Sequence, residues 1–374
     1  MTYSNPIRRL EALGQSIWLD YIRRDLVRDG ELLRLIDTDG VSGLTSNPDI
    51  FEKAIAESRI YDPEIAELAA GKADARTIYE TLCREDVRIA ADAFRSLYDR
   101  SDGRDGFVSI EINPHLAHDT EATFEEGQRL WSRLARPNVL IKVPATNEGL
   151  SAIRRLVAAG VGVNATLIFG LPRYLAVAEA YLAGIEERAF HGQPLNRPAS
   201  VASFYIGRID ALVDPKLDAL VAKDAPGSDL ARRLRGRAAI ASAKVAYHAF
   251  QDQFRSPRFR TLEAQGARVQ RLLWASTAAV DPLDDELKYV EALIGASTIN
   301  TVPLRTLEAY RERGEPEARL EAGLAGASEV LSQLEDLGIL LGTLAGRLEQ
   351  EGVVRFTHSF DVLMESLLRA SPPV

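Results

Sequence analysis

The chain has almost none of the features that would place it outside the cell or in a membrane. Among its 374 residues there is a single cysteine, Cys83, which excludes an intrachain disulfide and fits a reducing compartment. No uncharged apolar run approaches the ~20 residues that span a bilayer. The N-terminal residues lack the basic stretch and apolar core of a signal peptide. We therefore expect a cytoplasmic protein with no membrane partner.

Positive charge and glycine-rich phosphate loops are also scarce. Lysine and arginine number 45 against 54 acidic residues, which gives a formal net charge of −9. A general nucleic-acid partner is not expected, because it would need a basic surface stripe. No G-x-G-x-x-G or G-x-x-x-x-G-K-[ST] motif occurs where a strand would meet a helix. This absence argues against a doubly wound nucleotide-binding fold.

What the sequence does contain is a regular alternation of short apolar strands and amphipathic helices. Strands are predicted at 16–20, 40–48, 107–112, 139–143, 162–168, 199–206, 271–276 and 298–302. Helices are predicted at 5–16, 25–36, 49–101, 120–134, 148–159, 172–189, 208–255, 288–294 and 304–371, with an interruption around Pro226-Gly227 and a glycine-rich break at 338–346. This alternation predicts an α/β fold, a (β/α)8 barrel.

Additional helices are expected on this barrel. The helical region after the sixth strand is unusually long, and helices also follow the eighth strand from about residue 304. No linker separates a second domain, so residues 1–374 are predicted to form one barrel domain with the C-terminal helices packed on it. Those helices either cover the barrel or pair subunits in a homodimer.

Lys142 stands inside the apolar run of the fourth strand. Burial lowers the pKa of a lysine, and a neutral amine attacks carbonyl carbon, so Lys142 is a candidate Schiff-base residue. The alternative is a lysine at the rim of a strand, extended to solvent or paired with a carboxylate.

Other strands carry polar residues near their carboxyl ends with the two-residue period of one face. The pairs are Ser109 and Glu111, Asn164 and Thr166, Ser203 and Tyr205, and Trp274 and Ser276, while Asp20 and Asn47 end the first two strands. Residues two apart on a strand share a face, and barrel active sites form where strands end. A single polar residue of this kind usually lies at the rim of the barrel with its hydrogen bonds formed. Because unpaired buried polar groups cost ~1–3 kcal/mol each, the set as a whole predicts a shared site.

These groups support a consistent chemistry. A lysine that attacks a ketone forms an iminium, which permits cleavage of a nearby carbon–carbon bond. An acid such as Asp20 can carry the proton of the adjacent hydroxyl, and Glu111 with Thr166 can activate a water. The amides of Asn47 and Asn164 suit sugar hydroxyls. Arg208 can hold a phosphate, although on chain position alone it can equally be a surface arginine.

A metal site is the alternative at one loop. His115, His118 and Asp119 have side chains that bind metals, but no fourth ligand accompanies them. A polar rim loop is the preferred interpretation, and no metal is expected.

Seven segments, in this order, resemble the transaldolase family, in the longer form found in bacteria. They are Ser16-Ile-Trp-Leu-Asp-Tyr21, Gly43-Leu-Thr-Ser-Asn-Pro48, Val108-Ser-Ile-Glu-Ile112, Leu140-Ile-Lys-Val-Pro-Ala-Thr146, Val163-Asn-Ala-Thr-Leu-Ile-Phe169, Ala202-Ser-Phe-Tyr-Ile-Gly-Arg208 and Leu273-Trp-Ala-Ser-Thr277. The resemblance covers most of the chain. It implies a class I aldolase-type (β/α)8 barrel without a metal or organic cofactor.

The resemblance also implies an activity in the non-oxidative pentose phosphate pathway. Such an enzyme transfers a dihydroxyacetone unit from sedoheptulose 7-phosphate or fructose 6-phosphate to glyceraldehyde 3-phosphate or erythrose 4-phosphate. The implied roles are Schiff-base lysine for Lys142, acid/base for Asp20, water activation for Glu111 and Thr166, and substrate binding for Asn47, Asn164, Ser203, Tyr205, Arg208 and Ser276, with the distal phosphate on Arg208.

The chain departs from the family pattern in two places. The run Thr277-Ala-Ala-Val-Asp-Pro282 lacks the basic residue usual there, which implies a weaker phosphate clamp. Tyr205 replaces the usual phenylalanine and resembles the fructose-6-phosphate aldolase branch, which however has glutamine where this chain has Glu111. A class I aldolase acting without an acceptor or on a less phosphorylated sugar therefore stays open, as does an inactive barrel with a binding role.

Overall fold

The computed structural model describes residues 5–370 except 225, 280 and 282–283. Eight parallel strands form a closed barrel in which each strand pairs with the next and β8 pairs with β1. They are β1 Gln15–Asp20, β2 Gly43–Thr45, β3 Phe107–Glu111, β4 Val139–Pro144, β5 Val163–Ile168, β6 Ser200–Tyr205, β7 Arg271–Ala275 and β8 Thr298–Val302. The predicted (β/α)8 barrel is confirmed.

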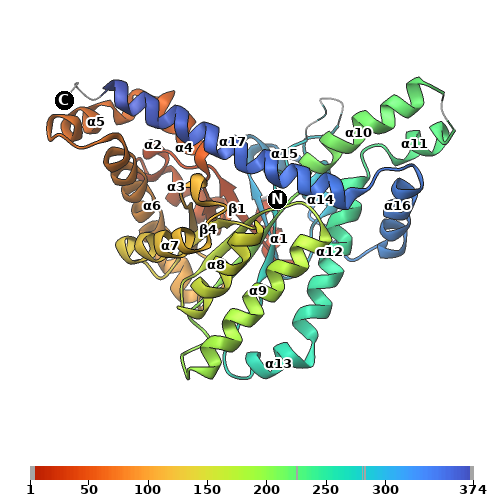
Figure 1. Ribbon diagram of the computed structural model, residues 1–374, viewed down its shortest axis with the longest axis horizontal. Helices are drawn as coiled ribbons and strands as arrows, with labels where there is room; N and C mark the ends of the chain where they lie inside the picture. The colour runs from red at the N-terminus through yellow and green to blue at the C-terminus, as the bar shows by residue number, and fades with distance from the viewer. Residues whose placement is uncertain (1–4, 225, 280, 282–283, 371–374) are drawn as a thin grey trace.

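Helices surround the barrel (Figure 1). The first half of the chain contributes α1 Pro6–Ala12, α2 Arg24–Arg28, α3 Glu31–Arg34, α4 Pro48–Ala56, α5 Asp62–Ala70, α6 Ala75–Arg100, α7 Thr120–Leu134, α8 Asn147–Ala158 and α9 Leu171–Phe190. The second half contributes α10 Gly207–Ala222, α11 Ser228–Leu234, α12 Ala238–Arg255, α13 Pro257–Glu263, α14 Lys288–Ala292, α15 Leu304–Arg313, α16 Leu324–Asp336 and α17 Leu341–Ala370. Short turns lie at η1 Leu35–Asp39, a π-helix, and at the 3-10 helices η2 Arg59–Tyr61 and η3 Pro114–Leu116. No helix among these described residues is long and apolar enough to cross a bilayer.

Several predicted helices are broken in the structure. The helix predicted over 49–101 is divided into α4, η2, α5 and α6, and Asp74 caps the last of these by accepting the Thr77 N–H at 2.8 Å. The predicted glycine-rich break at 338–346 is wrong beyond residue 340, since α17 runs through Gly342 and Gly346. A glycine costs a helix only ~1 kcal/mol, which the packing of a long helix offsets.

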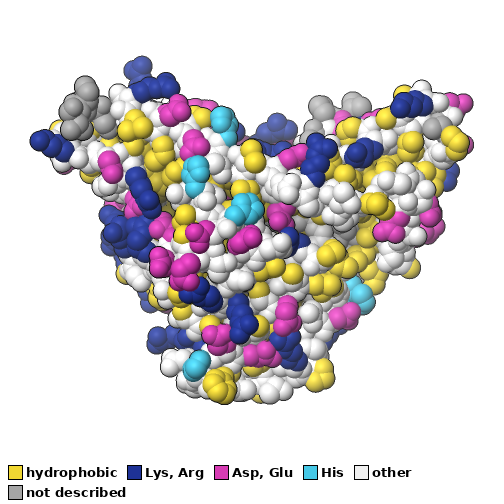
Figure 2. Space-filling view, viewed as in Figure 1, with side chains coloured by type: hydrophobic (Ala, Val, Ile, Leu, Met, Phe, Trp, Pro, Cys, Tyr) yellow, Lys and Arg dark blue, Asp and Glu magenta, His cyan; other side chains and the backbone are white. Residues whose placement is uncertain are grey.

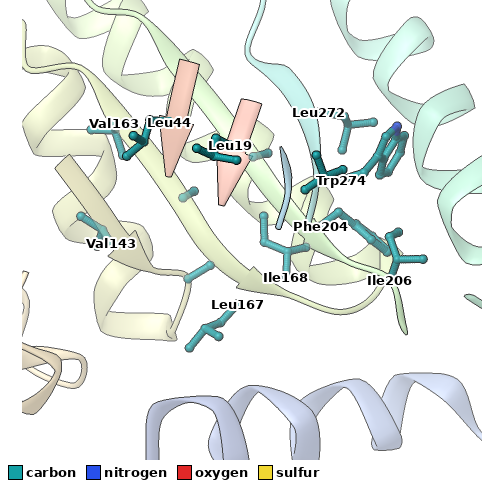
Figure 3. Close-up of a cluster of buried hydrophobic side chains, with 14 of the residues drawn as sticks. Leu19, Leu44, Val143, Val163, Leu167, Ile168, Phe204, Ile206, Leu272 and Trp274 are labelled. Carbon is teal, nitrogen blue, oxygen red and sulfur yellow. The ribbon is translucent and has the colours of Figure 1, made fainter. Parts of the chain in front are cut away.

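The barrel separates two sets of apolar side chains. The interior contains Trp18, Phe107, Leu140, Val201, Leu273, Ala275 and Ile299. The outer set faces the helices and includes Leu19, Leu44, Val143, Phe204 and Trp274 (Figure 3). Alternation of inner and outer residues along each strand is what places the polar side chains of one parity inside.

The predicted pairing of Trp274 with Ser276 on the inner face is wrong. The Trp274 ring packs on Phe204 in the outer set, with ring centroids 6.1 Å apart, and the inner residues of β7 are Leu273 and Ala275. Ser276 follows the strand in a left-handed conformation, with φ 54°. That turn redirects the chain, so strand parity does not extend to Ser276.

Gly43 is required by close packing inside the barrel. A Cβ at this position would lie 2.4 Å from the ring of Trp18, which is fully buried. We predict that Gly43→Ala lowers the free energy of unfolding by about 1–3 kcal/mol, because the indole has no space to move. Urea denaturation measures this change.

The matched control is Gly326→Ala in α16, where an added methyl group meets no atom within 4 Å. Alanine should there leave the free energy of unfolding unchanged or raise it by ~0.5–1 kcal/mol. Equal losses in the two variants would contradict the role given to Trp18.

Candidate active site

A pocket with a cavity volume of about 130 Å³ opens at the carboxyl ends of the strands. Its lining brings together most of the predicted site residues. The lining residues are Asp20, Thr45, Asn47, Asp49, Lys142, Ser203, Tyr205, Arg208, Ala275, Ser276, Thr301, Arg355 and Phe356. Glu111, Asn164 and Thr166 are not on this lining, but each contacts a residue that is.

Lys142 lies at the floor of the pocket, 3% exposed. The strand register aligns it with Glu111 of β3 on one side and Asn164 of β5 on the other. Its Nζ lies 3.1 Å from Glu111 Oε2 and donates a hydrogen bond to the Ser46 carbonyl at 3.1 Å. The Phe356 ring covers the amine, with its centroid 5.5 Å from Nζ. The lysine is therefore buried and paired.

The protonation of this pair differs from the sequence prediction. Burial by itself would lower the pKa of Lys142, but the nearby Glu111, Tyr205 and Asp20 raise it above its ordinary value. The predicted lowering of this pKa is therefore wrong for the resting site, where the amine is an ammonium. Burial raises the pKa of Glu111 to about 7, against the opposing charge of Lys142. A proton is thus close to balance on Glu111 at neutral pH.

Glu111 has bonding capacity left. Both of its carboxylate oxygens are buried: Oε2 lies 3.1 Å from Lys142 Nζ, and Oε1 has no hydrogen-bond partner among the described residues. A buried carboxylate without such partners is costly unless a ligand or water bonds to it. Glu111 is therefore suited to proton exchange rather than to fold support.

Asp20 is the last residue of β1 and is held by a short chain of hydroxyls. Thr45 Oγ1 donates to Asp20 Oδ1 at 2.7 Å and lies 2.7 Å from Thr301 Oγ1. Burial raises the pKa of Asp20, while the charge of Lys142 opposes that shift. An acid with a raised pKa, oriented toward a pocket, can both take and return a proton.

A second chain of hydrogen bonds crosses β6, β5 and β3. Ser203 Oγ donates to Asn164 Oδ1 at 2.7 Å, and Asn164 Nδ2 donates to Ser109 Oγ at 3.0 Å. Both ends of the Asn164 amide are thus engaged by buried protein groups. The Thr166 and Tyr205 hydroxyl oxygens lie 3.4 Å apart, and burial raises the pKa of Tyr205.

Asn47 does not extend β2 but caps α4. Its Oδ1 accepts the Ile50 N–H at 3.0 Å, and Pro48 begins the helix. The predicted second strand, 40–48, is correspondingly shorter, at Gly43–Thr45. This cap directs the Asn47 side chain to the pocket, where its NH₂ is the group that it can offer to a ligand.

Arg208 lies in the first turn of α10, beside Ser276. The Gly207 N–H donates to the Ser276 carbonyl at 2.9 Å, which joins the start of this helix to the end of β7. Among the residues that the structure describes, no carboxylate forms an ion pair with Arg208. The run after Ser276 brings no basic group: Thr277 bonds to Asn300 at 2.9 Å, Ala278 is partly exposed, and Val280 lies outside the described residues.

Sequence reasoning missed the contribution of α17 to the pocket. This helix crosses the molecule (Figure 1) and carries Arg355 and Phe356 into the lining. Asp49 holds it in place, because Arg355 lies 2.5 Å from Asp49 Oδ2 and Ser359 Oγ donates to Oδ1 at 2.8 Å. One sequence signal was Gly352, where a Cβ would lie 2.8 Å from Leu167 of β5, although a glycine alone does not name its neighbour.

The loop histidines pair with different acids. His115 Nε2 lies 2.7 Å from Asp361 of α17, and His118 Nδ1 lies 3.3 Å from Glu148 of α8. Within the described part of the chain, no group of three or more His, Cys, Asp and Glu side chains could hold a metal ion.

A lysine buried at the end of a barrel strand, with the carboxyl groups of Glu111 and Asp20 near it and hydroxyl groups around it, is the arrangement of a class I, Schiff-base aldolase. The comparisons identify the family within that class. Residues 17–367 match the model of the family Transaldolase/Fructose-6-phosphate aldolase, and the chain belongs to this family.

Curated relatives cover nearly the whole chain. A transaldolase of Thiobacillus denitrificans is 44% identical over 97% of this chain and 99% of its own length. "Transaldolase 2" of a Nostoc species is 40% identical over 97% of each chain. A transaldolase of Mycobacterium tuberculosis is 43% identical over 98% of this chain and 97% of its own length. The family match ends at residue 367 and therefore includes most of α17.

The burial of Glu111 gives a prediction about stability. Its folded-state pKa of about 7 exceeds the ordinary glutamate value of 4.5, so the folded protein binds more protons between these values and this group makes stability fall as pH rises. In Lys142→Met the opposing charge is gone, the folded pKa rises further, and the loss should continue above pH 7. The slope should be at most ~1.4 kcal/mol per pH unit.

Urea denaturation from pH 6 to pH 9 measures this slope. The control is the double variant Lys142→Met with Glu111→Gln, in which position 111 no longer carries a titratable carboxyl group. A Lys142→Met protein whose pH dependence above 7 equals that of the double variant would show that Glu111 is not the titrating group.

Proposed function

We propose that this chain is a transaldolase. It transfers a dihydroxyacetone unit from a ketose phosphate, such as fructose 6-phosphate or sedoheptulose 7-phosphate, to an aldose phosphate, such as erythrose 4-phosphate or glyceraldehyde 3-phosphate. The observation that carries this proposal is Lys142, buried at the pocket floor 3.1 Å from Glu111, with Asp20 on the same pocket. The name transaldolase on nearly full-length relatives supports it.

The first steps form the iminium. The Lys142 ammonium gives a proton to Glu111, whose pKa of about 7 makes its carboxylate a suitable acceptor. The neutral amine adds to the ketose carbonyl carbon, and the carbonyl oxygen becomes a hydroxyl by taking the proton that the nitrogen loses. Glu111, working through a water that Thr166 helps to hold, protonates this hydroxyl as it leaves as water. The nitrogen lone pair then forms the iminium double bond.

The next steps break and remake a carbon–carbon bond. Asp20 takes the proton of the hydroxyl next to the bond that breaks, the aldose leaves as an aldehyde, and the bonding electrons form an enamine with Lys142. The enamine carbon then attacks the acceptor aldehyde, and Asp20 returns the proton to the new alkoxide. Hydrolysis reverses the first steps and frees the product. The raised pKa of Asp20 supports this two-way role.

The remaining lining supports recognition of a sugar phosphate. Asn47 and Ser203 offer an amide and a hydroxyl to the dihydroxyacetone portion, with Asn164 orienting Ser203 through their 2.7 Å bond. Arg208 and Ser276 lie at one side of the pocket and suit the distal phosphate.

Direct aldol cleavage is the second candidate function. The matched family includes fructose-6-phosphate aldolases, and the Tyr205 hydroxyl lies 3.4 Å from Thr166, within the same pocket. The acid Glu111 and the names of the relatives favour transfer. An inactive barrel with a binding role, the third candidate, does not account for a buried Lys142 with two acids near it.

We infer that the chain works in the cytoplasm, has small sugar phosphates as its only required ligands, and pairs neither with nucleic acid nor with membranes. The single cysteine, Cys83, is buried and free, which suits a reducing compartment. Basic and acidic side chains are interspersed on the face seen in Figure 2, without a basic stripe. Homodimer formation stays a prediction.

Borohydride trapping tests the Schiff base. Incubation with fructose 6-phosphate and borohydride should add a reduced ketose to Lys142, seen by peptide mass analysis, and Lys142→Met should give no adduct and lose at least ~10³-fold in rate. Dihydroxyacetone should accumulate only slowly without an acceptor, while erythrose 4-phosphate restores turnover. Rapid release of dihydroxyacetone without an acceptor would favour the aldolase instead.

The pH dependence tests Glu111. As a proton acceptor it works as a carboxylate, so kcat/KM should rise with pH through about 7 and then level off. Glu111→Gln should lower kcat by ~10²–10⁴-fold and abolish this rise. The comparison is Asp49→Asn, which changes another acid of the pocket and should keep the rise of kcat/KM with pH. A rise that persists in Glu111→Gln would assign it to another group.

A further inference from the structure

Two arginines on different helices line the pocket. Arg208 enters from the first turn of α10, and Arg355 enters from the middle of α17. The third cation of the lining, Lys142, is at the floor and paired with Glu111, so it is not available for a distal anion. Two arginines from different helices thus lie around the opening of one pocket.

A sugar phosphate needs more than one arginine. Its terminal group carries close to two negative charges and offers oxygens to several donors, which arginine forks match well. The loop after β7 supplies no base, since Thr277 bonds to Asn300 and the neighbouring residues are alanines. Arg355 is the basic side chain that α17 brings to the same lining.

Arg355 forms an ion pair with Asp49 that a phosphate can replace. The Arg355 guanidinium lies 2.5 Å from Asp49 Oδ2, with its side chain 47% exposed. The Asp49 side chain is only 13% exposed, so a phosphate reaches Arg355 from the solvent side and competes with Asp49 for the guanidinium. Ser359 donates to the other Asp49 oxygen at 2.8 Å, so α17 keeps a contact to α4 when Arg355 turns.

We propose that Arg355 is the second phosphate-binding residue of the active site, acting with Arg208 on the terminal phosphate of the sugar. This inference rests on the proposed function, because it assigns the phosphate end of the same substrate. Arg355 neighbours Phe356, which covers Lys142. A bound phosphate therefore holds α17 over the reacting amine and makes the site selective for phosphorylated sugars.

The test compares a phosphorylated with an unphosphorylated ligand. Arg355→Met should raise KM for fructose 6-phosphate by about 10- to 100-fold with a smaller change in kcat, since a charge-assisted contact is lost. The rate at which borohydride and dihydroxyacetone, which has no phosphate, modify Lys142 should be unchanged. Arg355→Lys should recover part of the KM, because it restores the charge without the fork.

The matched control is Arg347→Met on the same helix. Arg347 pairs with Glu351 at 2.6 Å, its side chain is 59% exposed, and it is not on the pocket lining, so KM should not change. Equal losses of fructose 6-phosphate turnover and dihydroxyacetone trapping in Arg355→Met would assign Arg355 a structural role and overturn the proposal. An unchanged KM would overturn it too. A wild-type protein that traps no ketose on Lys142 would instead refute the proposed function.

Discussion

The structure depends on the burial of one ion pair, Lys142 with Glu111. Moving an ammonium and a carboxylate out of water costs several kcal/mol, and removing either partner would leave an unpaired buried charge. This cost is offset because the two charges lie 3.1 Å apart at the floor of a pocket and the lysine also donates a hydrogen bond to the Ser46 carbonyl. The same burial raises the pKa of Glu111 to about 7, so this carboxyl group can take or release a proton at neutral pH beside the Lys142 ammonium.

The barrel makes this pairing possible through strand register. Parallel strands place Glu111, Lys142 and Asn164 at one level on three consecutive strands, all facing inward. Apolar residues one position away face outward to the helices, which lets each strand support both the core and the site. Below the polar level, Trp18, Leu140 and Leu273 fill the barrel and exclude water from the floor of the pocket. The strictness of this packing shows at Gly43, where the backbone passes against the Trp18 ring.

The sequence predicts local periodic features well and long-range ones poorly. Strand positions and the inner face of Asp20, Glu111, Lys142, Asn164, Thr166 and Ser203 follow from a two-residue period that needs no tertiary information. Trp274 was misplaced because the left-handed turn at Ser276 leaves no pattern in the residues that precede it. The predicted direction of the Lys142 pKa shift is wrong for a physical reason. An apolar strand indicates that Lys142 is buried, but its distance to Glu111, 31 positions away, depends on the register between β3 and β4. Glycines at 342 and 346 suggested a break, but a 30-residue helix docked along its length tolerates them.

The C-terminal helix shows why the site is not complete in the barrel alone. It begins after all eight strands and returns over β5, where the left-handed Leu167 reaches it at Gly352 (Figure 3). The glycine at 352 lets the helix lie close to the Leu167 side chain, one turn before Phe356 covers the Lys142 amine. Buried apolar side chains pack α17 on the body: Leu348, Val353, Phe356, Phe360, Leu363 and Leu367. Polar contacts add to this packing, with Arg173 2.8 Å from Glu349, His115 2.7 Å from Asp361, and Asp49 bonded to Arg355 and Ser359. The helix is therefore a packed wall of the pocket, and this packing is what keeps the Phe356 ring over the Lys142 amine.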